Sequence, residues 1–361
     1  MAGLRDIDYV EMWVEDAGAV AAMYQATFGF ERIAEAAPET GLQGHHSVVL
    51  AQGEAHIVIT SPDDCEGTVA DFVKLHGDGV RDIAFRADDA RRVFDQAVAR
   101  GAQPIHAPSE HAGDGAPVVR ATISGFDDVV HTLVQREGAF LDALPACYRP
   151  VGSPARTKPV LFDAIDHVAM CLRTGTLDEV AEYYKRVLDF EDGHRELVYS
   201  ERSGMNARVV QCGPIKFPLQ EPLASNPSGP IAEFLDLYRG AGVYHLAFLT
   251  NDIVHTLREL HQNNVDALPT PGRYYDMLTN RVGPLEERLD DLRDLNVLVD
   301  RDEWGYLLQV FTRSLHERQT LFFEVIQRKN ARGFGSGNIR ALFDAVEADR
   351  LAAREMNSSV A

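Results

Sequence analysis

Two histidines and one glutamate in the second half of the chain are the residues best suited to chemistry. His167 and His245 each lie within a run of apolar residues, and Glu324 follows Phe322 and Phe323. An isolated carboxylate is costly to bury unless it is paired or binds a metal ion. Two imidazoles and one carboxylate on one face of a metal leave coordination positions open, which suits non-haem iron(II) that binds a substrate and O₂. A structural hydrogen-bond network among the three side chains is the alternative interpretation.

A weak internal repeat predicts where these three residues lie. Four stretches of the first half match four of the second: 7–12 with 165–170, 24–30 with 184–190, 77–105 with 240–268, and 131–136 with 323–328. In this alignment the two copies differ at each candidate ligand: His167 falls on Tyr9, His245 on Asp82, and Glu324 on Thr132. The second copy therefore holds the candidate site, and the first copy is expected to be a structural partner.

Each copy has the pattern of a strand, a helix and then several strands. Segments 7–14 and 165–172 alternate apolar and polar residues like half-buried strands. Segments 17–28 and 177–188 carry apolar residues at helical spacing, and amphipathic helices that begin at aspartate are predicted over 88–100 and 252–264. These patterns predict an α+β protein of two related domains.

Domain limits follow from a proline-rich stretch in the middle of the chain. We predict an N-terminal domain over 1–144 without metal, a linker over 145–160 and a C-terminal metal-binding domain over 161–361. Near the C-terminus, apolar residues recur at i, i+3, i+4 and i+7 from Ile339, which predicts a helix over 335–350. This helix is either a lid over the site or an ordinary packed terminal helix.

The amino-acid composition argues against nucleic acids and membranes as partners. The 361 residues include 55 acidic and 35 basic ones, a net charge of −20. Such a charge repels phosphate backbones and anionic lipid, so no nucleic-acid or membrane partner is expected. The four cysteines show no CxxC or zinc-type spacing, and the N-terminus lacks the pattern of a signal peptide. These features predict a cytoplasmic protein with reduced thiols.

Several stretches make the chain resemble the 4-hydroxyphenylpyruvate dioxygenase and 4-hydroxymandelate synthase family. They are IDHVAM (165–170), GAGVYHLAF (240–248), TPGRYYDML (270–278), VDRDEWGYLLQVFT (299–312) and LFFEVIQRKNARGFGSGNIRALFDAVE (321–347), with GDGVRDIAF (77–85) and VVHTLVQREG (129–138) in the first half. The resemblance implies two tandem domains of paired βαβββ modules, the vicinal oxygen chelate or glyoxalase-like architecture, with a C-terminal lid helix. It implies Fe(II) bound by His167, His245 and Glu324, an aryl 2-oxo acid and O₂ as substrates, and a homo-oligomer.

The family has two branches, which oxidise 4-hydroxyphenylpyruvate at different carbons. One oxidises the ring and gives homogentisate, and the other oxidises the benzylic carbon and gives 4-hydroxymandelate. Ring-oxidising members typically carry phenylalanine where this chain has Ile339, so the chain resembles the mandelate-forming branch there. The alternatives are a homogentisate-forming enzyme, the same chemistry on a different 2-oxo acid, and a non-catalytic binding protein of this architecture.

Further residues match or depart from the family's substrate pocket. The matching positions are Gln309, Phe322, Phe334, Asn338 and Phe343. The resemblance implies that the glutamine holds the carboxylate region of the substrate or orders water, and that the phenylalanines pack on its ring. Where the family usually has Ser, Asn, Gln and Gln, this chain has Ala207, Gln220, Pro230 and Tyr244. A site that stops hydrogen-bonding a substrate hydroxyl loses its preference for it, so these changes leave the substrate open.

Overall fold

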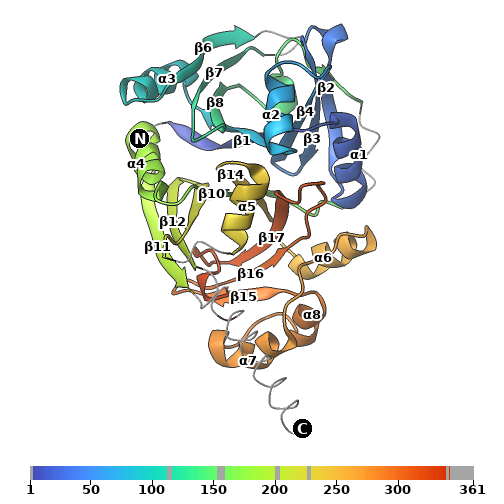
Figure 1. Ribbon diagram of the computed structural model, residues 1–361. Coiled ribbons are helices and arrows are strands. Elements are labelled where there is room, and N and C mark those ends of the chain that lie inside the picture. Colours follow the sequence, from blue (N-terminus) through green and yellow to red (C-terminus); the bar gives the residue numbers. More distant parts are fainter. Residues whose placement is uncertain are drawn as a thin grey trace.

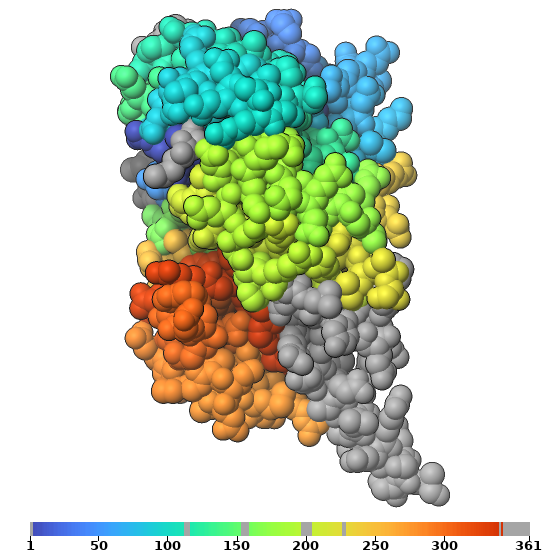
Figure 2. Space-filling view, turned by 90° about the vertical axis from the view of Figure 1, so that its left-hand side faces the viewer, coloured from blue at the N-terminus to red at the C-terminus, as the bar shows by residue number. Residues whose placement is uncertain are grey.

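Each half of the chain forms one mixed β-sheet, and the two sheets stack on one another in the computed structural model (Figure 1), which describes residues 3–111, 116–152, 159–199, 204–225, 229–338 and 341. Figure 2 shows the blue to blue-green N-terminal half stacked on the yellow-green to red C-terminal half. The first sheet has the strand order β6-β7-β8-β5-β1-β4-β3-β2-β9. Its strands are β1 (Leu4–Trp13), β2 (Glu31–Ala36), β3 (His45–Gln52), β4 (Ala55–Pro62), β5 (Gly79–Ala87), β6 (Pro104–His111), β7 (Val118–Ser124), β8 (Val130–Gln135) and β9 (Arg149–Pro150).

The second sheet repeats the arrangement of the first, with the order β11-β12-β13-β10-β14-β17-β16-β15. Its strands are β10 (Ala164–Cys171), β11 (Glu191–Tyr199), β12 (Gly204–Cys212), β13 (Ile215–Pro222), β14 (Gly242–Leu249), β15 (Leu298–Arg301), β16 (Tyr306–Phe311) and β17 (Phe322–Lys329). The predicted α+β class and the two tandem domains of paired modules are therefore confirmed.

The helices connect the strands, and α1, α3, α4 and α6 begin within two residues of the predicted positions. They are α1 (Ala17–Thr27), α2 (Thr68–His76), α3 (Ala90–Ala99), α4 (Leu177–Leu188), α5 (Pro230–Tyr238), α6 (Ile253–Gln262), α7 (Gly272–Val282) and α8 (Leu289–Asp294). Asp16, Asp89 and Asp252 each accept a hydrogen bond from the backbone three residues on, at the start of α1, α3 and α6. These side chains satisfy backbone donors that lack a partner within the helix.

Strand register confirms the alignment of the two copies. Asp82 is the partner of Glu11 on β1, as His245 is of Ala169 on β10. On the other side, β5 runs parallel to β8 and β14 runs parallel to β17. Position 132 of the first sheet consequently corresponds to position 324 of the second, as the sequence alignment predicts.

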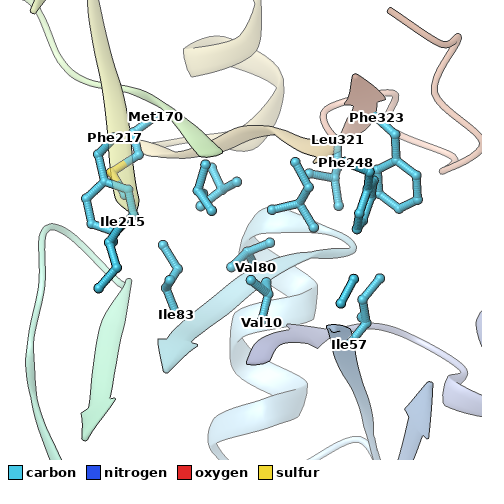
Figure 3. Close-up of a cluster of buried hydrophobic side chains, with 14 of the residues drawn as sticks. Val10, Ile57, Val80, Ile83, Met170, Ile215, Phe217, Phe248, Leu321 and Phe323 are labelled. Atoms are coloured by element: carbon cyan, nitrogen blue, oxygen red, sulfur yellow. The ribbon is translucent and has the colours of Figure 1, made fainter. Parts of the chain in front are cut away.

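The core lies between the two sheets. Val10 and Met12 of β1 and Val168 and Met170 of β10 are fully buried in one cluster that spans both halves. Figure 3 shows Val10, Val80 and Ile57 of the first half facing Phe248, Leu321 and Phe323 of the second. Because side chains alternate along a strand, the residues between these positions point to the outer face of each sheet. The candidate metal ligands lie on the outer face of the second sheet.

Some elements differ from the sequence expectation. The predicted linker contributes β9, which pairs with β2 at the edge of the first sheet. Helices α7 and α8 lie between α6 and β15, where the first copy passes from α3 directly to β6. Of the predicted lid helix, residues 336–338 and 341 are helical, and the remainder lies outside the described residues. No helix in the described part of the chain is long and apolar enough to cross a membrane.

Candidate metal centre

His167, His245 and Glu324 converge on the outer face of the second sheet. They lie on the adjacent strands β10, β14 and β17, and all three are buried. Oε2 of Glu324 is 3.3 Å from Nε2 of His167 and 3.1 Å from Nε2 of His245, and the two nitrogens are 3.4 Å apart. Ligand atoms roughly 2.1 Å from one metal ion and at right angles are about 3.0 Å apart, so this triangle has the size of three facial ligands.

The charge of these groups suits a divalent cation. Burial would raise the pKa of Glu324, but the adjacent His167 and His245 outweigh it and lower the pKa to about 2. Burial alone would lower the pKa of His167, but the carboxylates of Glu324 and Asp166 outweigh it, so the pKa of His167 is raised. For His245 burial is the larger effect, and its pKa is lowered. The carboxylate of Glu324 favours a proton on the neighbouring His167. A bound metal ion would replace that proton. The donor set of two nitrogens and one carboxylate fits iron(II) with positions left open.

A buried ion pair fixes the ring of His167. Nδ1 of His167 lies 2.8 Å from Oδ1 of Asp166, whose two oxygens also accept hydrogen bonds of 2.7 Å from Nε and Nη2 of Arg328. Burial would raise the pKa of Asp166, but the hydrogen bonds from Arg328 and His167 hold it well below its usual value. An ionised Asp166 keeps the proton on Nδ1 and so directs the lone pair of Nε2 toward the metal position.

The first sheet holds the same ion pair without a metal ligand beside it. Arg136 donates to both oxygens of Asp8, at 3.0 and 2.6 Å, as Arg328 does to Asp166. Each arginine also donates to two backbone carbonyls of the chain that follows its strand. The aspartate–arginine ion pair therefore has the same structural function in both domains. In the second domain it also orients the metal ligand His167.

This symmetry supplies a matched pair of variants. We expect Asp166→Asn to weaken metal binding by about 10- to 100-fold, because the orientation and basicity of His167 are no longer fixed. Asp8→Asn leaves metal affinity unchanged, while both variants lose stability because each leaves a buried arginine without its carboxylate. Metal titration and urea unfolding of the two proteins measure both effects. Equal metal affinity in the two variants would contradict the orienting function of Asp166.

A second hydrogen-bond chain joins Glu324 to α7. Nε2 of Gln309 donates to Oε1 of Glu324 at 3.2 Å, and Oε1 of Gln309 accepts from Nδ2 of Asn338 at 2.9 Å. Oδ1 of Asn338 accepts from the hydroxyl of Tyr274 at 2.7 Å and from Arg281 at 3.0 Å. In this arrangement Gln309 positions a metal ligand, and its predicted contact with the substrate stays a prediction.

A glycine allows the chain before the lid helix to approach this chain of hydrogen bonds. Gly335 has a φ of +79°, and a Cβ at this position would collide with the amide of Gln309. The preceding Phe334 lies edge-on to the ring of His167, with centroids 5.3 Å apart. The segment consequently covers the metal position and limits the access of water to it.

The cavity beside the three ligands contains most of the pocket residues expected from the sequence. Ala207, Gln220, Gln309, Phe334 and Asn338 line it. Phe322 and Tyr244 do not: they pack against each other, with centroids 4.7 Å apart, beside the lining residues. Pro230 begins α5 and is not among the residues that line the cavity. Ile339 and Phe343 lie outside the described residues.

Several lining residues were not expected from the sequence, among them a histidine and a methionine. His194 of β11 and Met205 of β12 contribute to the wall that also contains Ala207, Val209 and Pro218. They lie on the two strands at the edge of the sheet, where no motif or periodicity distinguishes them. His194 supplies a polar group at a wall that is otherwise largely apolar.

Comparisons with known proteins agree with this geometry. Residues 1–139 match the family model described as "Hydroxyphenylpyruvate dioxygenase, HPPD, N-terminal", and residues 164–310 match the Glyoxalase/Bleomycin resistance protein/Dioxygenase superfamily. The chain is 35% identical to a 4-hydroxyphenylpyruvate dioxygenase of Dictyostelium discoideum over 95% of this chain and 98% of the relative. It is 36% identical to a probable 4-hydroxyphenylpyruvate dioxygenase of Aspergillus fumigatus, with 95% and 93% covered. A triple mutant of 4-hydroxymandelate synthase from Streptomyces coelicolor superposes with a TM-score of 0.86 at 42% identity, covering 96% and 99%.

Proposed function

This chain belongs to the 4-hydroxyphenylpyruvate dioxygenase and 4-hydroxymandelate synthase family, and on that premise we propose that it converts 4-hydroxyphenylpyruvate to 4-hydroxymandelate with Fe(II) as cofactor. The observation that carries this choice of product is the match to the Streptomyces coelicolor 4-hydroxymandelate synthase, at 42% identity over 99% of that chain. The dioxygenases above are 35% and 36% identical. Ile339, at the position where ring-oxidising members typically carry phenylalanine, supports the same branch.

The residues of the site bind, orient and exclude water. When bound, Fe(II) would supply the Lewis acidity and the redox chemistry with O₂ that oxidative decarboxylation needs. His167, His245 and Glu324 would hold it, and a set of three protein ligands would leave it able to bind the carboxylate and keto oxygens of the substrate. Asp166 and Gln309 fix two of these ligands, and Phe334 shields the site from solvent.

A second candidate is the same chemistry on another 2-oxo acid. Ala207, Val209, Met205 and Pro218 make one wall of the cavity apolar, and the family usually has serine at position 207. A site that offers few partners to a phenol hydroxyl has less reason to prefer it over an unsubstituted ring. Phenylpyruvate is the substrate that distinguishes this candidate.

A product assay tests the proposal. Protein loaded with Fe(II) without air is given 4-hydroxyphenylpyruvate and O₂, and products are identified by mass spectrometry and chromatography against standards. 4-Hydroxymandelate is the expected product. Homogentisate would assign the chain to the ring-oxidising branch, and O₂ uptake with phenylpyruvate alone would support a different substrate.

A substitution at position 339 tests the basis of the product choice. We expect Ile339→Phe to raise the fraction of ring-oxidised product, because ring-oxidising members of the family typically carry phenylalanine at this position. The ratio of homogentisate to 4-hydroxymandelate measures the effect. Ile339→Leu, of similar volume, is the matched control, and an unchanged ratio in Ile339→Phe would remove this residue as an argument for the mandelate branch.

A further inference from the structure

The outer face of the first sheet carries a second cavity at the position that matches the metal centre of the second. Its volume is about 890 Å³, within the range of small-molecule sites. Asp82 and Thr132 line it, at the positions that correspond to His245 and Glu324. Arg120 also lines it, and its pairing with Val134 places it where Gln309 lies in the second sheet. Where the second domain has metal ligands, the first domain therefore has charged and hydroxyl groups that line an open cavity.

Arg120 offers an anion site. Its guanidinium donates a hydrogen bond of 2.6 Å from Nη2 to the hydroxyl of Tyr9, and among the residues that the structure describes no carboxylate lies within ion-pair distance of it. A guanidinium carries five N–H donors in a planar fork, which matches a carboxylate in two parallel hydrogen bonds. Arg120 is partly buried and has no such partner among the described residues, so a carboxylate from a ligand would be bound favourably there.

Glu11 and Asp82 offer a cation site next to it. They are directly opposite each other on β1 and β5. Oε1 of Glu11 accepts from Thr60 at 2.7 Å and from the Trp13 indole at 3.1 Å, while the backbone N–H of Thr132 donates to Asp82 at 2.9 Å. Burial, and then the charge of Glu11, raise the pKa of Asp82 to about 7. Two like charges opposite each other in a sheet repel, and an ammonium group between them would remove that repulsion.

The two charged sites are close together and adjoin an apolar wall. Arg120, Glu11 and Asp82 all line this one cavity. Trp13, Val69, Ile105 and Val130 also line the cavity. Ile105 is 44% exposed, so its side chain is available for contact with an apolar group of a ligand.

We propose that this cavity binds a free α-amino acid with an apolar side chain. Its carboxylate is held by Arg120, its ammonium group lies between Glu11 and Asp82, and its side chain packs on Ile105 and Trp13. The site is on the outer face of one sheet, and the metal centre is on the outer face of the other. The proposal does not depend on which reaction the metal centre performs.

Calorimetric titration of the full chain, prepared without metal, tests the class of ligand. L-Phenylalanine is the probe, with 3-phenylpropanoate and 2-phenylethylamine as analogues that lack the ammonium and the carboxylate group. We expect saturable binding of L-phenylalanine and affinity at least about tenfold lower for each analogue, since each leaves a buried charge without its partner. The absence of saturable heat with L-phenylalanine, L-leucine and L-methionine at millimolar concentrations would overturn the proposal, as would equal affinity for an analogue.

Substitutions test the location. Arg120→Gln and Asp82→Asn are expected to weaken L-phenylalanine binding at least about tenfold. Ile105→Glu changes an exposed residue, so it keeps the fold, and it should weaken binding by placing a charge against the apolar side chain. Glu324→Gln, in the metal centre, should bind the probe as the unmodified protein does. Loss of binding in Glu324→Gln with retention in Ile105→Glu would place the ligand in the catalytic cavity and refute the second site.

Discussion

Replacement of the metal-binding carboxylate, Glu324→Gln, is expected to reduce turnover at least about a thousandfold, equivalent to about 4 kcal/mol. Glu324 is buried and ionised, and its Oε2 lies 3.3 and 3.1 Å from the Nε2 atoms of His167 and His245. A neutral amide is a weaker ligand and cannot balance the charge of a divalent ion. Metal content after equilibration with Fe(II), and O₂ uptake with 4-hydroxyphenylpyruvate, measure the two consequences.

A partly buried glutamate of the same domain supplies the control. The side chain of Glu287 is 11% exposed and accepts a hydrogen bond of 3.0 Å from the hydroxyl of Tyr306, away from the metal centre. Glu287→Gln should retain both metal and turnover. Normal turnover in Glu324→Gln would show that the three side chains form a structural hydrogen-bond network, the alternative that their sequence left open.

Phe323 is the position where the loss of packing should cost most. It follows Phe322 on β17 and points away from Glu324 into the space between the sheets. Its ring lies 4.6 Å from that of Phe28, 5.1 Å from Tyr24 and 4.9 Å from Phe248, measured between centroids. We expect Phe323→Ala to lower the free energy of unfolding by about 3–5 kcal/mol, because a cavity remains between the two domains.

Urea unfolding of the metal-free protein measures this loss. Because one core cluster includes residues of both halves, fluorescence and circular dichroism should report a single transition. Leu237→Ala is the control, since Leu237 is 53% exposed and its loss should have little effect. Two separate transitions in the unmodified protein would show that the halves unfold independently.

The metal ligands were predictable because each is costly to bury without function and because the repeat aligned them. His167, His245 and Glu324 lie at positions where the first copy has Tyr9, Asp82 and Thr132, and strand register reproduces that alignment. Periodicity and aspartate caps likewise predicted α1, α3, α4 and α6. The sequence predicted the metal ligands well because each lies on a strand with a recognisable pattern and is a polar side chain that is costly to bury unpaired.

The rest depends on tertiary contacts that leave no local pattern. Asp166 is part of the conspicuous motif IDHVAM, yet its function follows from Arg328, 162 residues away. His194 reaches the cavity from an edge strand, and the sequence gives no sign of that. Phe322 was expected in the pocket, but its ring packs edge-on against Tyr244 beside the lining residues.

The ion pairs Asp8–Arg136 and Asp166–Arg328 also bear on how a metal centre could be transplanted within this molecule. The support for a histidine at position 9 is present in the first domain, since Asp8 precedes that position as Asp166 precedes His167. Positions 82 and 132 have the register of the other two ligands. The first domain therefore already has the ion pair and the strand register that support a metal centre. Only the three side chains at positions 9, 82 and 132 would have to be replaced by metal ligands.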